Sequence, residues 1–177
     1  MSPTFQSIYR ELEQQRTEIL TRISDLSSEK FNLNPAPGKW SLAQVLTHIL
    51  IAEQLSLAYM EKKMLGISQL KNSGLSEAVR LGILKIVLRI PSLKFKAPAV
   101  VVRNTPSPLS VEELIIRWEA HHLGLKTFLD KIDDKDEKKL LYKHPGAGRL
   151  NARQAMVSFR EHIIHHWPQI NRLLNRD

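Results

Sequence analysis

The residues with the clearest chemical potential in this 177-residue sequence are its seven histidines, three of which lie together near the end as His162-Ile-Ile-His165-His166. Side chains four residues apart lie on one face of a helix, so His162 and His166 can both reach a single metal ion. His162 and His165, three residues apart, could do the same. The spacing alone leaves both pairs open.

The neighbouring residues separate the two pairs. One stripe of this segment is mostly apolar and is expected to face the core: Ala155, Phe159, His162, Ile163, His166, Ile170 and Leu173. A second stripe is polar and is expected to face water: Ser158, Glu161, His165 and Arg172. His162 and His166 are therefore predicted to point inward, and His165 outward.

Two inward imidazoles need partners, because an unsatisfied buried polar group costs about 1–3 kcal/mol. One shared cation satisfies both rings, whereas two ordinary core histidines need two separate hydrogen-bond partners, and this alternative stays open. Two neutral histidines make a weak metal site, so a third ligand is required. His48, in an apolar segment that is predicted to be helical, is the best candidate, and its alternative is a histidine near the helix cap that faces a groove. The predicted metal ligands are His48, His162 and His166.

The remaining polar candidates are weaker. His121 and His122 are adjacent, so at most one of them is expected to face inward. His144 lies in the segment HPGAG and is expected to be a turn residue near the mouth of the bundle. No carboxylate is placed clearly enough to be a general base; those considered are Glu53, Glu119 and Glu161.

Length and composition indicate one globular domain over residues 1–177, with 42% hydrophobic and 25% charged residues. The sequence has no cysteine, which excludes a disulfide framework, a thiolate metal site and a cysteine nucleophile. The first residues, MSPTFQSIYRELEQQ, contain no apolar signal segment. A cytoplasmic location is expected.

Four segments with helical periodicity predict an all-α, four-helix bundle. The first helix is expected at 4–27, followed by the breaker NLNPAPGK at 32–39. Ser41 and Gln44 form a capping-box pattern that begins a second helix ending near residue 65, and Ser110 and Glu113 form another that begins a third helix ending near 131. The fourth helix is expected at 152–174.

Residues 67–109 are predicted to be a long irregular insertion between the second and third helices, with one helix at 76–89 and an extended run APAVVV. Residues 71–103 contain seven cationic residues and one acid, which gives +6 of the total charge of +8. These charges and Pro91 exclude a transmembrane span at 81–102. The basic stretch fits a solvated face, an entrance for an anionic ligand, or a surface for nucleic acid or anionic membranes. Its one aromatic residue, Phe95, weighs against nucleic acid.

Two motifs resemble the DinB-like superfamily of small metal-binding four-helix proteins, which includes thiol-dependent transferases. The first is Pro37-Gly38-Lys39-Trp40-Ser41-Leu42-Ala43-Gln44-Val45-Leu46-Thr47-His48. The second is Gly148-Arg149-Leu150-Asn151-Ala152-Arg153 followed by His162-x-x-x-His166-x-x-Gln169-Ile170. The sequence departs from the family at Ile163, where many relatives have glutamate, and at Pro168, which is expected to kink the last helix and could reorient His166.

The resemblance implies a helix order other than a simple meander and a three-histidine site for nickel, zinc or a similar divalent ion. Such an ion would activate water to hydrolyse a small electrophile, or activate a low-molecular-weight thiol cosubstrate to attack one. A catalytically silent metal-binding interaction module is the alternative. The expected partner is a small-molecule substrate, and a homodimer is an alternative to the monomer.

Overall fold

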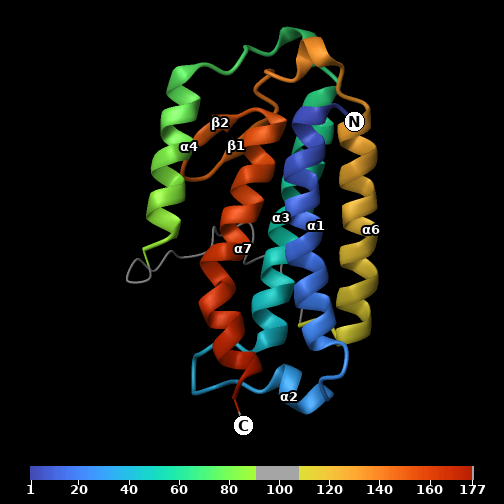
Figure 1. Ribbon diagram of the computed structural model, residues 1–177, viewed down its shortest axis with the longest axis vertical. Helices are drawn as coiled ribbons and strands as arrows, with labels where there is room; N and C mark the ends of the chain where they lie inside the picture. Colours follow the sequence, from blue (N-terminus) through green and yellow to red (C-terminus); the bar gives the residue numbers. More distant parts are fainter. Residues whose placement is uncertain (91–107, 177) are drawn as a thin grey trace.

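The computed structural model describes residues 1–90 and 108–176 (Figure 1). Within these ranges, four long helices form the bundle: α1 (Pro3–Ile23), α3 (Leu42–Met64), α6 (Val111–Asp130) and α7 (Ala152–Leu174). Helices α1 and α7 run in one direction, and α3 and α6 run in the opposite one. The prediction of an all-α four-helix bundle is confirmed.

The order of the helices around the bundle is not a meander. Helix α1 packs against α6 and α7, and α3 packs against the same two helices. The first two long helices therefore lie diagonally across the bundle, as the family resemblance implied. This arrangement makes α3 and α7 direct neighbours, so side chains from the second and fourth long helices can meet.

Capping boxes begin three of the long helices and fix where their first turns lie. Ser41 Oγ accepts a hydrogen bond from the Gln44 backbone N–H at 3.2 Å, and Gln44 Oε1 accepts one from the Ser41 N–H at 2.9 Å. Ser110 with Glu113 makes the same reciprocal pair at the start of α6. Both were predicted. A third box, Asn151 with Gln154, begins α7 at the predicted residue.

The first helix is shorter than predicted. It ends at Ile23, and a separate short helix, α2 (Ser28–Asn32), follows a turn. The hydroxyl of Ser27 accepts a hydrogen bond from the Lys30 N–H, which starts the new helix, and the Phe31 side chain is fully buried. The cap at Ser27 and the burial of Phe31 explain why the chain changes direction before the proline-rich breaker.

The core fills the space between the four long helices. Its largest fully buried side chains come from each of the first three long helices and from α2: Phe5, Leu12, Ile19, Ile23, Phe31, Leu42, Leu46, Ile49, Leu50, Met60, Leu114 and Trp118. Helix α7 contributes residues such as Ile163 and Ile170, which are also fully buried.

The described part of the insertion contributes a further long helix, α4 (Leu75–Leu88), close to the predicted range, and α4 packs on α7 outside the four-helix core (Figure 1). A 3-10 turn at Ile67–Gln69 precedes α4, and another at Asp134–Asp136 follows α6. The run APAVVV lies outside the described residues. No helix among the described residues has both the length and the apolarity needed to cross a membrane.

A small hairpin, not predicted from the sequence, joins α6 to α7. Strand β1 (Tyr142–His144) pairs antiparallel with β2 (Gly148–Leu150), so that Tyr142 lies opposite Leu150. Gly148 has a φ of 72°, a left-handed conformation that glycine adopts without strain. The predicted turn HPGAG is therefore the loop of this hairpin, which packs against α3, α4 and α7.

Candidate metal centre

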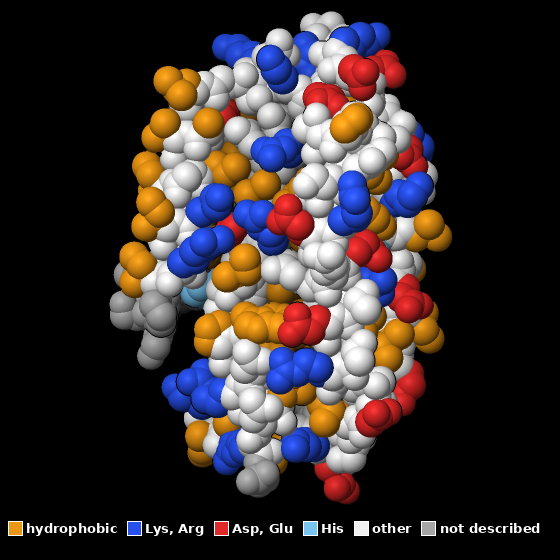
Figure 2. Space-filling model, viewed as in Figure 1, with side chains coloured by type: hydrophobic (Ala, Val, Ile, Leu, Met, Phe, Trp, Pro, Cys, Tyr) orange, Lys and Arg blue, Asp and Glu red, His pale blue; other side chains and the backbone are white. Residues whose placement is uncertain are grey.

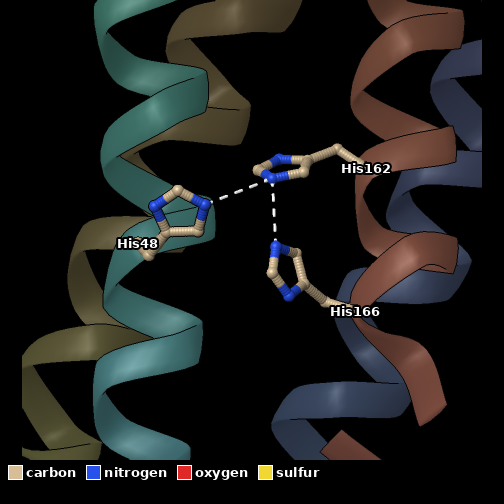
Figure 3. A group of neighbouring side chains, drawn as sticks. All are labelled: His48, His162 and His166. Carbon is tan, nitrogen blue, oxygen red and sulfur yellow. Dashed lines mark hydrogen bonds between the residues drawn. The ribbon is translucent and has the colours of Figure 1, made fainter. Parts of the chain in front are cut away.

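His48 on α3 and His162 and His166 on α7 point toward one another across the interface of the two helices (Figure 3). The Nε2 atom of His162 lies 3.3 Å from Nε2 of His48 and 3.2 Å from Nε2 of His166. The three ligand-type nitrogens lie within 4.8 Å of one another, and this is the one such histidine or carboxylate cluster among the described residues. The structure thus brings together the three residues that were selected from the sequence.

The spacing of these nitrogens suits a bound cation. A tetrahedral ion with bonds of about 2.0–2.1 Å separates its ligand atoms by roughly 3.3–3.4 Å, close to the two short distances observed here. Hydrogen bonds between the rings cannot satisfy all three, because His162 Nε2 faces two other nitrogens and either carries one hydrogen or offers one lone pair. A single cation placed between the rings could accept a lone pair from each.

Burial keeps the rings in the form that binds metals. Burial lowers the pKa of His48 to about 4, and burial together with nearby His48 lowers the pKa of His166 to about 4. The pKa of His162 is also lowered, first by burial and then by its histidine neighbours. All three imidazoles are therefore neutral at pH 7, and neutral imidazole is the form that donates a lone pair to a metal.

Two neighbours orient these rings. Gln169, one turn beyond His166, places its Oε1 3.3 Å from His166 Nδ1, where it can accept a hydrogen bond. A proton on Nδ1 leaves the lone pair on Nε2, which faces the cluster. Trp40, just before α3, packs on the His48 ring with centroids 5.2 Å apart. Both residues belong to the resembling motifs, but the sequence pattern alone did not assign these roles.

Pro168 does not remove His166 from the cluster. Helix α7 continues through Pro168 to Leu174, and Gln169 still reaches the His166 ring. The N–H that Pro168 lacks would bond to the carbonyl of Ile164, between His162 and His166, yet the Nε2 atoms of the two histidines still lie 3.2 Å apart.

The stripe of α7 that was expected to face water is partly buried, and that expectation was wrong. Ser158 is 2% exposed and Glu161 is fully buried, because α4 packs over this side of α7. His165 Nδ1 lies 2.7 Å from the carbonyl oxygen of Leu88, at the end of α4, and donates a hydrogen bond to it. His165 does not join the three-histidine cluster, although its ring lies 5.2 Å from that of His166, and its Nδ1 faces α4 rather than water.

The expectation that at most one of His121 and His122 faces inward was also wrong. The two residues are 6% and 2% exposed, respectively, because α6 lies between α1 and α3 and each ring turns toward a different neighbour. His121 Nε2 lies 3.5 Å from Glu53 Oε2 on α3, whereas His122 Nδ1 is hydrogen-bonded to Glu13 on α1. Neither ring joins the three-histidine cluster.

Glu53 and Glu161 are the two buried carboxylates of the described residues, and neither belongs to the three-histidine cluster. Glu53 Oε2 accepts a hydrogen bond from Trp118 Nε1–H at 3.2 Å. Glu161 accepts hydrogen bonds from Arg89 and from Arg160. Neither therefore offers an obvious general base, in agreement with the sequence analysis.

His144 is held in one tautomer by the hairpin loop. Its Nδ1 accepts hydrogen bonds from the backbone N–H groups of Gly146 and Ala147, both at 3.0 Å. Burial lowers the pKa of His144 to about 4, so the ring is neutral with its proton on Nε2. The expected turn residue thus stabilises the loop with its own side chain.

Comparison with known proteins agrees with this architecture. The sequence matches the DinB superfamily over residues 11–170. The solved structure of YfiT from Bacillus subtilis, described as a probable metal-dependent hydrolase with an unusual four-helix bundle topology, superposes with a TM-score of 0.61 at 13% identity. The match covers 98% of this chain and 87% of that one, and at this identity it establishes the shared fold. No curated protein matches the sequence.

Proposed function

The chain belongs to the DinB superfamily, and from this premise we propose that it is a metal-dependent enzyme whose divalent ion is held by His48, His162 and His166. The observation that carries the proposal is the convergence of three Nε2 atoms, from the buried His48 and the half-buried His162 and His166, with His162 Nε2 3.3 and 3.2 Å from the other two. The description of YfiT as a probable metal-dependent hydrolase supports hydrolysis as the first candidate reaction.

The donor set suits a catalytic ion. Three neutral imidazoles leave the charge of a divalent ion uncompensated and leave at least one coordination position open. Zinc and nickel are the ions that we propose, since imidazole suits both. Bound there, the ion would supply Lewis acidity, which lowers the pKa of a water or thiol bound to it towards about 7.

The protein's own residues would hold and orient the site. His48 is positioned by the capped start of α3 and by the Trp40 ring, and His166 by the amide of Gln169. In a hydrolysis, the oxygen of water forms a bond to the acyl carbon of a small ester or amide, the bond to the leaving group breaks, and the leaving group takes up a proton.

Thiol-dependent transfer is the second candidate, and one observation favours it. Glu53 and Glu161 both lie outside the three-histidine cluster, and no carboxylate of the described residues lies within it to take a proton from water. A thiol is more acidic than water and depends less on a general base. The chain has no cysteine, so the thiol would be a small cosubstrate, and we propose that the enzyme acts on small molecules in the cytoplasm.

The test is a paired screen of zinc- or nickel-loaded protein, with ester and amide substrates in one arm and small thiols with electrophiles in the other. The proposal predicts turnover that a chelator abolishes, that returns on adding the metal, and that is lost in His166→Ala. Turnover in the first arm alone identifies a hydrolase, and turnover that requires the thiol identifies a transferase. A metal-loaded protein without chelator-sensitive turnover in either arm contradicts the enzyme proposal and supports a silent binding module.

A further inference from the structure

Helix α4 has a second apolar face that the bundle does not use. Its inner face packs on α7 through residues such as Leu81 and Leu84, which are buried and half-buried. Its outer face presents four large apolar side chains with high exposure, Leu75 (81%), Val79 (53%), Ile83 (56%) and Ile86 (66%), and the exposed Ile90 (39%) follows just after the helix. Hydrophobic side chains are visible along the outer edge of α4 in Figure 2. We call these five residues the outer stripe.

The outer stripe is continuous along the helix. Its four members within α4 follow one another at steps of four, four and three residues, which confines them to an arc of about 80° at 100° per residue. The 14 residues of α4 span about 21 Å. Elsewhere in the described chain, exposed apolar residues are more scattered; on α6, for example, Ile116 and Leu123 lie seven residues apart. A continuous exposed apolar face of this length indicates an interaction surface.

The cations beside the outer stripe identify the chemistry of the partner. Arg80 flanks the stripe on one side and Lys85 on the other, whereas Arg89, which follows the last residue of α4, is held by the buried carboxylate of Glu161. The one acidic residue of α4, Glu77, caps the first turn by accepting a hydrogen bond from the Gly74 N–H and also pairs with Arg80. The outer face of α4 therefore combines apolar and cationic groups without an exposed acid.

The hairpin beside α4 adds two more cations. Lys143 and Arg149 are opposite each other in the register of β1 and β2, both are exposed, and strand β2 packs against α4. Like charges directly opposite each other are unfavourable in a hairpin unless a counter-charge is near. No carboxylate of the described residues pairs with either one, so an anionic partner would relieve this repulsion.

We propose that the outer stripe docks on the surface of an anionic lipid bilayer. Apolar side chains on one face of a helix enter the boundary between headgroups and acyl chains, and flanking cations contact the lipid phosphates. A second copy of the chain fits less well, because joining two outer stripes would bring the flanking cations of both copies together. Nucleic acid fits less well too, since an apolar stripe gains nothing against phosphates.

The first test is co-flotation of the full chain with vesicles of phosphatidylcholine alone or mixed with phosphatidylglycerol. The proposal predicts binding only to the anionic vesicles, with affinity that falls as salt is raised. Ile83→Gln with Ile86→Gln should weaken binding about tenfold or more, and Lys143→Gln about fivefold, since one cation near the surface contributes ~1 kcal/mol. The matched control, Ile116→Gln with Leu123→Gln on α6, should bind like the wild type.

A second test locates the contact, because the chain has no cysteine and a single introduced one can carry a fluorophore. The proposal predicts that an environment-sensitive dye at Val79→Cys shifts to the blue with anionic vesicles, whereas the same dye at Leu123→Cys does not. Equal binding to neutral and anionic vesicles would overturn the proposal, and so would an equal loss of binding in the α6 control. Self-association of the chain without vesicle binding, abolished by Ile83→Gln with Ile86→Gln, would also overturn it.

Discussion

The guanidinium of Arg89, at the end of α4, holds the fully buried carboxylate of Glu161, which directly precedes His162 on α7. Arg89 Nε–H donates to Glu161 Oε2 at 2.8 Å, and Nη2–H donates to Oε1 at 3.0 Å. Burial alone would raise the pKa of Glu161, but the hydrogen bonds from Arg89 and Arg160 outweigh it and lower the pKa. The insertion is thus fixed to the helix that carries two of the three histidines.

Removing this carboxylate should destabilise the protein. Glu161→Ala leaves the guanidinium groups of Arg89 and Arg160 without their shared partner, so we expect the free energy of unfolding to fall by about 3 kcal/mol. Urea denaturation measures this change. Glu61→Ala, at an exposed position on α3, is the matched control and should change stability by less than about 0.5 kcal/mol. Equal effects from the two variants would show that the pair has no structural role.

The sequence was sufficient to predict the bundle because its local signals agree with one another. Ser41 and Ser110 carry the side chains that cap α3 and α6, and apolar periodicity continues to the observed ends of these helices. The ring of Phe31 shows where such signals fail. Its burial depends on the packing of α2 against α3, which periodicity within the first helix does not reveal.

The site was predictable only in part, for a similar reason. His162 and His166 share a stripe with fully apolar neighbours, so their inward direction follows from the sequence. The burial of Glu161 does not follow from the sequence, because it depends on how α4 packs. Helix α4 has apolar residues on both faces, so its sequence does not indicate which face packs against α7. His121 and His122 are both buried because α6 lies between α1 and α3, and this position depends on the tertiary arrangement of the helices.

The metal-free protein should lose stability as the pH falls from about 7 to 5. An unfolded histidine has a pKa of about 6.5, whereas burial lowers the pKa of His48 and of His166 to about 4. Over this range the unfolded chain takes up protons that the folded chain does not, so the free energy of unfolding decreases, by roughly 2 kcal/mol for each ring. Urea denaturation at the two pH values checks this, and His166→Gln should remove its share. A pH-independent midpoint would contradict the buried neutral rings.

Gln169 should support metal affinity without being a ligand. Its side chain fixes His166 with Nε2 toward the cluster, and loss of such a partner typically weakens metal binding by about 10–100-fold. We therefore expect a competition titration to give Gln169→Ala a zinc affinity about 10–100-fold lower than that of the wild type. Gln169→Glu should retain the wild-type affinity, because its carboxylate also accepts the hydrogen bond. An unchanged affinity in the alanine variant would remove Gln169 from the site.

The hydrogen bond between Trp118 and Glu53 should be important for stability on the opposite side of α3. Trp118→Phe removes the N–H that binds the buried carboxylate, and we expect a loss of about 1–3 kcal/mol in thermal or urea denaturation. Trp167→Phe, at a half-buried position, is the control for the effect of replacing an indole with a smaller ring. A similar loss in both variants would attribute the effect to packing alone.

Metal content of protein purified without a histidine tag tests the central claim most directly. With zinc or nickel supplied, elemental analysis should give about one ion per chain for the wild type and for His165→Ala, whose ring bonds to Leu88 instead. His162→Ala removes the nitrogen that lies nearest both other ligands, so its metal content should fall to background. A His162→Ala protein that still carries a full equivalent of metal would contradict the account.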